Sequence, residues 1–428
     1  MFAIYYFFVY YFARINLLSI IFPSIIFIIF TIKNLKNHKQ KKSKLIYLIL
    51  VFIDLFLIIY NCIHKNLPFT NVDWINYDYF ALNALNSSHS LIGVFNNAID
   101  FFTGIVAIIY KLFGADIKII YFYILPCSQI LSYYVYKCIF LLSKNEKKSS
   151  VGSILILLYP VNFIFSLSVL REIPIQMVLT ISIYYIILFL QTSKTKDFVI
   201  ASIFVIIACL MHSGVVGVFI AYIYAFFQQK FSKKIKYFNI KAIILSLIII
   251  FILLLTPIGN QMIKRFNKIN SVTDIVDTIN SQNTILEANT QYITSNSSSI
   301  FDIILTLPYR YVMFILAPFI WQVYSFGTIL SFIVDSIPRL IIVFNILFLL
   351  KNSNKMEKND RKIFIILMIG IFITDLIFSL GCNNYGQAMR HRSKILPLEL
   401  IIIISLRYKI KGVIENEKNR NSYISQSN

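Results

Sequence analysis

A short polar stretch near the end of the chain holds residues that bind phosphate and transfer protons. "GCNNYGQAMRHRSKILP", residues 381–397, lies between two long apolar runs and places Arg390, His391 and Arg392 in a row. A guanidinium binds phosphate oxygens through two parallel hydrogen bonds, whereas an imidazole exchanges protons near neutral pH. The stretch is therefore a candidate site for binding an anion and for acid–base chemistry.

The same residue types recur at a few other positions. The chain has 30 Lys but only 10 Arg, so the choice of arginine at a given position is informative. Besides residues 390–392, the candidates are Arg171 and Glu172 in "SVLREIP", His212 in "CLMHSGVV", Arg310 in "LPYRYVMF" and Asp73 in "NVDWINYDYFALNAL".

The composition predicts that these residues lie in a membrane protein. Of the 428 residues, 58% are hydrophobic and 14% are charged, and the mean hydropathy is +0.74. A soluble globular protein has about 25% charged residues. Runs such as residues 242–258 approach the roughly 20 apolar residues that cross a bilayer. We therefore expect an all-α, polytopic membrane protein with a single transmembrane domain over residues 1–428.

The net charge of +21 follows the membrane topology and gives no reason to expect nucleic acid as a partner. Of the 40 Lys and Arg, 26 fall in six short segments, at residues 33–44, 141–150, 191–197, 228–241, 351–362 and 407–420. Short basic loops beside apolar runs mark the cytoplasmic side, and they also attract anionic headgroups. Membrane lipids are accordingly the expected surroundings.

Apolar runs read against these basic loops predict eleven spans with the N-terminus outside. The spans cover about 15–32, 45–61, 118–140, 151–170, 174–192, 198–211, 214–228, 241–257, 328–350, 363–381 and 394–407. The pair flanking residue 212 is short, so it is expected to be tilted, broken or re-entrant. The loop 382–393 must face outward, against the positive-inside trend.

Four further segments complete the predicted topology. Residues 62–117 and 258–307 form extracytoplasmic segments, residues 308–321 form a shallow hairpin, and residues 408–428 form a cytoplasmic tail. Five scattered cysteines without a CxxC pair indicate neither a disulfide framework nor a zinc site.

All the candidate residues map to the outer ends of spans, which is the main argument that they act together. Ionisable groups near the membrane core are costly and usually mark function. Each also has an ordinary explanation: an ion pair or headgroup contact for the arginines, a buried hydrogen bond for His212, a solvated carboxylate for Asp73, and an interfacial aromatic belt for Trp74 and Tyr77. Adjacent residues do not share a helix face, so at most one of Arg171 and Glu172 is expected to point inward.

The chain resembles Wzy-type and EpsG-like bacterial polysaccharide polymerases, which are related to the GT-C glycosyltransferases. Asp73, Tyr77 and Ala81, at four-residue spacing, resemble the GT-C first-loop signature, followed by "KLFG" at 111–114. "FSLSVLREIP", "MHSG", "LPYRYVMFILAPFIW" and "GQAMRHRSKILP" resemble the motifs that follow in that family. The Asp-x-Asp that binds metal in many GT-C enzymes is absent near Asp73, so metal-independent transfer without a cofactor is expected.

The resemblance implies a polymerase that joins undecaprenyl-diphosphate-linked oligosaccharides at the outer face of the bacterial cytoplasmic membrane. Arg171, Arg310, Arg390 and Arg392 would stabilise the diphosphate leaving group. A base must take the proton of the acceptor hydroxyl, and Asp73, His212 and His391 are the candidates. Glu172, Trp74 and Tyr77 are further candidate site residues, and a chain-length regulator is a further candidate partner.

Two other functions remain open on the sequence. One is a GT-C-type glycosyltransferase or ligase that uses a polyprenyl-phosphate-linked sugar, which needs fewer cations at the site. The other is a lipid-linked oligosaccharide flippase, which needs charged residues along a path at mid-membrane depth.

Overall fold

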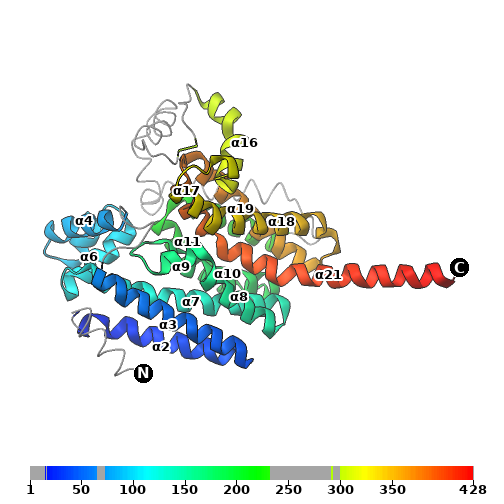
Figure 1. The fold of residues 1–428 in the computed structure, drawn as a ribbon, viewed down its shortest axis with the longest axis horizontal. Helices are drawn as coiled ribbons and strands as arrows, with labels where there is room; N and C mark the ends of the chain where they lie inside the picture. Colours follow the sequence, from blue (N-terminus) through cyan, green and yellow to red (C-terminus); the bar gives the residue numbers. More distant parts are fainter. Residues whose placement is uncertain (1–14, 16, 65–72, 232–290, 293–298, 428) are drawn as a thin grey trace. The chain divides into compact units, whose positions relative to one another are not determined.

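The computed structural model describes residue 15 and residues 17–64, 73–231, 291–292 and 299–427. Every regular element in these ranges is a helix, apart from one isolated bridge between Gln291 and Asn384. The predicted all-α class is therefore confirmed for the described chain (Figure 1). The predicted span 241–257 and most of the predicted outer loop 258–307 lie outside the described residues.

Six helical segments are long and apolar enough to cross a membrane, and they coincide with six of the predicted spans. They are α2 (Leu17–Asn37), α3 (Lys41–His64), α7 (Ile117–Ser143), α10 (Glu172–Thr192), the continuous stretch Phe326–Lys351, and α19 (Lys358–Gly381). These segments support the prediction that the chain is a membrane protein. The full count of eleven spans stays a prediction.

The predicted span 151–170 is a bent pair of helices. Helix α8 (Glu146–Leu158) ends before Pro160, and α9 (Pro160–Ser166) leaves at an angle of 63°. Proline lacks an N–H and its ring clashes with the preceding turn, so the break falls where the sequence requires it. The pair α11 (Thr195–Met211) and α12 (Val216–Phe231) is short, as predicted, and its break lies at His212.

The chain divides into two compact units. Unit 1 comprises residues 1–137 and 145–181, and unit 2 comprises residues 138–144 and 182–428. Within unit 1, α4 (Asp73–Asn86), α5 (Leu91–Asn97) and α6 (Phe101–Phe113) pack against one another within the first predicted outer segment. Tyr77 and Ala81, one helical turn apart, are both buried and lie on one inward face of α4.

Unit 2 contains the helices that carry the C-terminal candidates. They are α16 (Ile300–Leu316), α17 (Phe326–Ser331), the π-helix η5 (Phe332–Ser336), α18 (Ile337–Lys351), α19, α20 (Tyr385–Ser393) and α21 (Leu396–Ser427), with the 3-10 turns η2 (Ser213–Val215), η4 (Ile320–Gln322) and η6 (Ser353–Lys355).

Small residues allow α12 and α19 to pack with their backbones in close contact. A Cβ added at Gly217 would meet the backbone nitrogen of Thr374 at 2.5 Å, and one at Gly370 would meet the Cα of Val218 at 3.3 Å. Close approach at small residues drives helix association in membranes, where lipid removes the hydrophobic advantage of larger side chains. This contact sets the position of the turn at His212 relative to α19.

Two predicted segments differ from the structure. Residues 308–321 are not a shallow hairpin: α16 runs on to Leu316, starting from a capping box between Ser299 and Asp302, and the chain reverses only afterwards. Residues 382–393 are not a loop: they form α20, whose first turn is capped by the side chain of Asn384. The side-chain caps at Ser299 and Asn384 show where the two helices begin.

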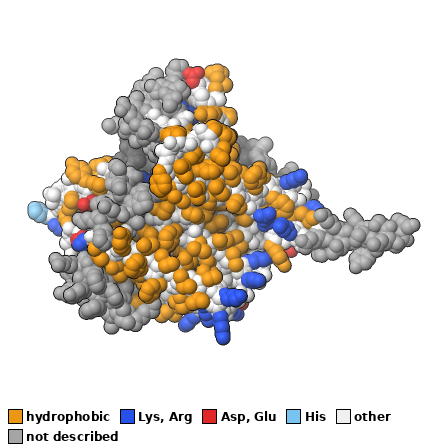
Figure 2. Space-filling view, in the orientation of Figure 1, with side chains coloured by type: hydrophobic (Ala, Val, Ile, Leu, Met, Phe, Trp, Pro, Cys, Tyr) orange, Lys and Arg blue, Asp and Glu red, His pale blue; other side chains and the backbone are white. Residues whose placement is uncertain are grey.

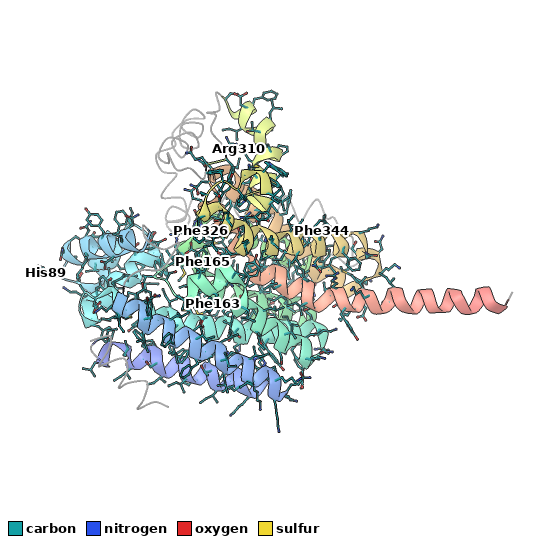
Figure 3. All side chains as sticks on the ribbon, in the orientation of Figure 1. His89, Phe163, Phe165, Arg310, Phe326 and Phe344 are labelled. Carbon is teal, nitrogen blue, oxygen red and sulfur yellow. The ribbon has the colours of Figure 1, made fainter. Side chains whose placement is uncertain are left out.

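The surface of the described helices is apolar, as expected of a chain in lipid. Figure 2 shows hydrophobic side chains over most of the visible face and Lys and Arg gathered toward its edges. Figure 3 labels two of these apolar residues, Phe326 at the start of α17 and Phe344 on α18, and they are 79% and 68% exposed. Such exposure would be a liability in water and is normal in a bilayer.

Candidate functional site

In unit 1, Arg171 is held between a carboxylate and an aromatic ring. Its guanidinium NH1 lies 3.0 Å from Asp100 Oδ2, and its Cζ lies 5.7 Å from the centre of the Tyr77 ring. Asp100 caps α6 through Thr103, whose backbone N–H and hydroxyl both donate to it. The arginine therefore ties the first turn of α6 to the start of α10 and to α4.

Arg171 and Glu172 are both buried, so the expectation that at most one points inward is wrong. The backbone carbonyl of Arg171 accepts the first bond of α10 from Ile175, so Arg171 precedes the helix and Glu172 is its first residue. The rule for neighbours on a helix surface does not apply across a helix start. A carboxylate in the first turn is also favoured by the helix dipole.

Two candidates of unit 1 are described only by their backbone. Asp73 is the first residue of α4, one turn before Tyr77, and Trp74 follows it. Their roles stay predictions. Asp78, one residue after Tyr77, accepts a hydrogen bond of 2.5 Å from the hydroxyl of Tyr110. Burial and this carboxylate both raise the pKa of Tyr110, which keeps its phenol protonated.

In unit 2, the structure brings the two candidate histidines together. The His212 and His391 rings lie 4.8 Å apart, although 178 positions separate them in the sequence, and both contact the ring of Phe378. His212 follows α11, and His391 lies on α20. Both are partly exposed, as is Arg390. The turn after α11 and helix α20 thus bring two imidazoles together in unit 2, and Arg390 precedes one of them on α20.

A buried lysine that the sequence did not single out supports this cluster. The Nζ of Lys394 lies 2.9 Å from His391 Nδ1 and 3.1 Å from the backbone carbonyl oxygen of Arg390, and it stands 5.7 Å from the centre of the Phe378 ring. Its side chain is fully buried. We call His212, Arg390, His391 and Lys394 the His–Lys cluster.

The described contacts of the two histidines bear on which ring nitrogen carries the proton. A charged Lys394 donates to His391 Nδ1, and the backbone N–H of Gly214 donates to His212 Nδ1 at 3.3 Å. A neutral imidazole that accepts at Nδ1 carries its proton on Nε2. In this form each ring has an N–H that can donate to an oxyanion, and its other nitrogen is already an acceptor.

Three cations at the end of α20 act on the cysteine that precedes this helix. Arg390, Arg392 and Lys394 each act electrostatically on Cys382 to lower the pKa of its thiol. Burial acts in the opposite direction and is the larger effect, so the pKa of Cys382 is raised to about 12. Cys382 therefore stays a neutral thiol beside three positive charges.

Arg392 has a structural role that the sequence did not reveal. Its NH1 donates to the carbonyl of Phe314 at 2.8 Å, and its NH2 donates to the carbonyl of Ala317 at 2.9 Å and to the carboxylate of Asp335. The side chain is 2% exposed. It therefore joins the end of α16 and η5 to α20, and it differs in this from its neighbour Arg390.

Arg310 of α16, labelled in Figure 3, is also buried. Its Nε donates to the Thr306 hydroxyl at 3.2 Å. Burial lowers the pKa of Arg310, and the nearby Tyr292 opposes this shift. Tyr292 stacks on Tyr385 of α20, and its hydroxyl donates to the Cys382 carbonyl at 3.1 Å. Residues 291–292, which precede α16 in the sequence, therefore contact the start of α20.

Comparison with known proteins gives no match. No family model, curated protein or solved structure matches the chain. The function is therefore inferred from the arrangement of the described side chains and from the motifs in the sequence. Among the described residues no group of His, Cys, Asp and Glu is arranged to hold a metal ion.

The signal for Lys394 was present in the sequence. His391 and Lys394 are three positions apart, which places them on one face if the stretch is helical. Because residues 382–393 were predicted to be a loop, that spacing carried no weight. Asp100 could likewise have been found as a helix cap, since it precedes the apolar run "FFTGIVAIIY".

Proposed function

We propose that the chain is a polymerase that joins undecaprenyl-diphosphate-linked oligosaccharide units at the outer face of the bacterial cytoplasmic membrane. The observation that carries the proposal is the His–Lys cluster: two imidazoles 4.8 Å apart, with a buried lysine 2.9 Å from one of them and also bonded to the backbone oxygen of Arg390. A diphosphate leaving group needs such preorganised donors where its charge develops.

The proposed roles follow from the contacts. Lys394 supplies a fixed positive charge and orients His391, whose Nε2–H donates to a phosphate oxygen. His212 offers a second donor of the same kind, and Arg390 adds a guanidinium that can bind two oxygens.

Accumulation of lipid-linked units in cells tests this function. With His391→Ala, single repeat units should accumulate on the outer leaflet, where external glycosidases reach them, and long chains should disappear. Wild-type protein expressed from the same vector is the positive control, and His89→Ala, on the α4–α5 connection of unit 1, is the matched histidine control. Normal polymer in His391→Ala cells would contradict the proposed role of the cluster.

A flippase is the second candidate, and one observation favours it. Arg339, Asp375 and Glu399 are buried together within the helices of unit 2, where a transporter places its ionisable residues. The same experiment separates the two functions. A flippase defect would leave the units on the cytoplasmic leaflet, out of reach of external enzymes.

A further inference from the structure

Three buried charges lie together in unit 2, apart from the contacts that define the His–Lys cluster. Arg339 on α18 donates from NH1 to Glu399 on α21, and its NH2 lies 3.8 Å from Asp375 Oδ2 on α19. The three side chains are at most 3% exposed. Two carboxylates therefore share one guanidinium at a buried place.

The two carboxylates are bound unequally. Glu399 has a short charged hydrogen bond to Arg339, whereas Asp375 is beyond hydrogen-bonding distance from it. Asp375 Oδ1 and Glu399 Oε1 are both buried, and neither has a hydrogen-bond partner among the described residues. An ionised carboxylate left in this state is costly, because burial without compensating bonds removes its hydration.

The charges around the trio do not balance. Arg392 acts electrostatically on both carboxylates, and Asp335, the partner of Arg392, acts on Glu399. Tyr311 of α16 also faces the trio and is neutral. Two arginines against three carboxylates leave one negative charge, and a single proton would cancel it.

We propose that Asp375 is a proton-binding site: in the folded protein at neutral pH it carries a proton, while Glu399 stays ionised as the partner of Arg339. The site lies within the transmembrane helices and is separate from the proposed chemistry. Because Arg392 acts on both carboxylates and also holds α20, loss of this proton changes the electrostatic balance at the helix that carries His391.

Two substitutions on the purified full chain test the assignment, since each removes one carboxylate and keeps its shape. Asp375→Asn imitates the protonated acid, so its Tm at neutral pH should lie within about 2 °C of the wild type. Glu399→Gln removes the ionised partner of Arg339, so its Tm should fall by more than about 5 °C. Asp360→Asn is the control on the same helix. Asp360 forms an ion pair with Lys409, whose side chain is partly exposed.

The pH dependence gives a second, independent measurement. A proton held by the folded chain and released on unfolding stabilises the fold, so stability falls as the pH rises and the proton is lost. The Tm of the wild type should therefore decrease from neutral to alkaline pH more steeply than that of Asp375→Asn. The infrared band of a protonated carboxylic acid at neutral pH should weaken in Asp375→Asn and not in Asp360→Asn.

Three results would overturn the proposal. A Tm loss, or failure to fold, in Asp375→Asn as severe as in Glu399→Gln would show that both carboxylates are ionised. Equal alkaline slopes for the wild type and Asp375→Asn would show that Asp375 binds no proton. A wild-type Tm that rises with Na⁺ but not with choline, and loses this response in Asp375→Asn, would show that a metal cation occupies the site.

Discussion

Unit 1 and unit 2 each place an arginine and aromatic rings at predicted outer ends of their helices, but they use the cation differently. In unit 1, the charge of Arg171 is met by the carboxylate of Asp100 at 3.0 Å. In unit 2, the described contacts of the Lys394 Nζ are to a carbonyl oxygen and an imidazole nitrogen. The two units therefore hold their cations with different kinds of partner, and the meeting of two imidazoles makes unit 2 the place where we propose that a diphosphate binds.

The same contrast separates two neighbours on α20. The guanidinium of Arg392 donates to two backbone carbonyls and pairs with Asp335, whereas Arg390, the residue before His391, is partly exposed. Arg390 and Arg392 are the same residue type two positions apart, and they differ in burial. The arginines that the sequence marks as one group therefore have at least two roles, one structural and one proposed for binding.

The largest effect is expected at Arg392. Arg392→Lys keeps the charge next to Asp335 but leaves the carbonyls of Phe314 and Ala317 without donors. The loss in stability should be about 3–5 kcal/mol, measured by thermal unfolding of the purified protein. Arg390→Lys is the matched control and should unfold like the wild type. If Arg392→Lys were stable and inactive, Arg392 would be a ligand of the substrate after all.

Lys394→Met should sharpen the comparison by removing the fixed charge while filling its buried space. Replacing a buried ion with an apolar side chain of similar size is often neutral for stability. Activity should fall about 10²–10³-fold, as for the loss of one preorganised donor. The rate of polymer formation by purified protein measures this, with the Tm recorded alongside. Activity within a factor of about three would remove the cluster from the proposed site.

Gly217→Ala should disturb unit 2 while leaving unit 1 intact. Its Cβ would meet the backbone nitrogen and the hydroxyl of Thr374 at 2.5 Å, so α12 must move away from α19. We expect a destabilisation of about 1–3 kcal/mol and lower activity, since the His212 turn moves with α12. Gly412→Ala, where nothing lies within 4 Å, is the control. Equal stability of the two variants would contradict this packing.

The smallest effect is expected at Asp100. Asp100→Asn keeps an acceptor for the cap of α6 but removes the charge that faces Arg171. Stability should fall by about 1 kcal/mol, and activity should change by less than tenfold if Arg171 is mainly structural. A loss as large as that of Lys394→Met would place the Arg171 pair in the reaction and would break the distinction between the units.

Hydrophobic patterning predicted the helices well, because a bilayer imposes length and apolarity on each span. The spans that became α3, α7, α10 and α19 agree with the structure within a few residues. The inward face of α4 was also predictable, since Tyr77 and Ala81 are one turn apart. Residues 382–393 were wrongly predicted to be a loop because the stretch is polar, whereas it forms a capped helix. The contact between His391 and Lys394 was missed for the same reason.

The partners of the buried charges could not be predicted from the sequence. In the sequence, four residues each look like an isolated polar residue in an apolar run: Asp335, Arg339, Asp375 and Glu399. Their pairing depends on how α18, α19, α20 and α21 pack, which no local pattern encodes. The meeting of His212 with His391 has the same origin, although both residues were singled out by type and by predicted side of the membrane.

Conversion of a defined substrate by the purified protein tests the central claim most directly. Wild-type protein in lipid nanodiscs, given undecaprenyl-diphosphate-linked repeat units without nucleotide sugar or ATP, should produce a ladder of longer products. Arg390→Lys should keep its Tm and lose most of this ladder. No ladder from the wild type with an authentic repeat unit, or an undiminished ladder from Arg390→Lys and Lys394→Met, would contradict the polymerase site proposed in unit 2.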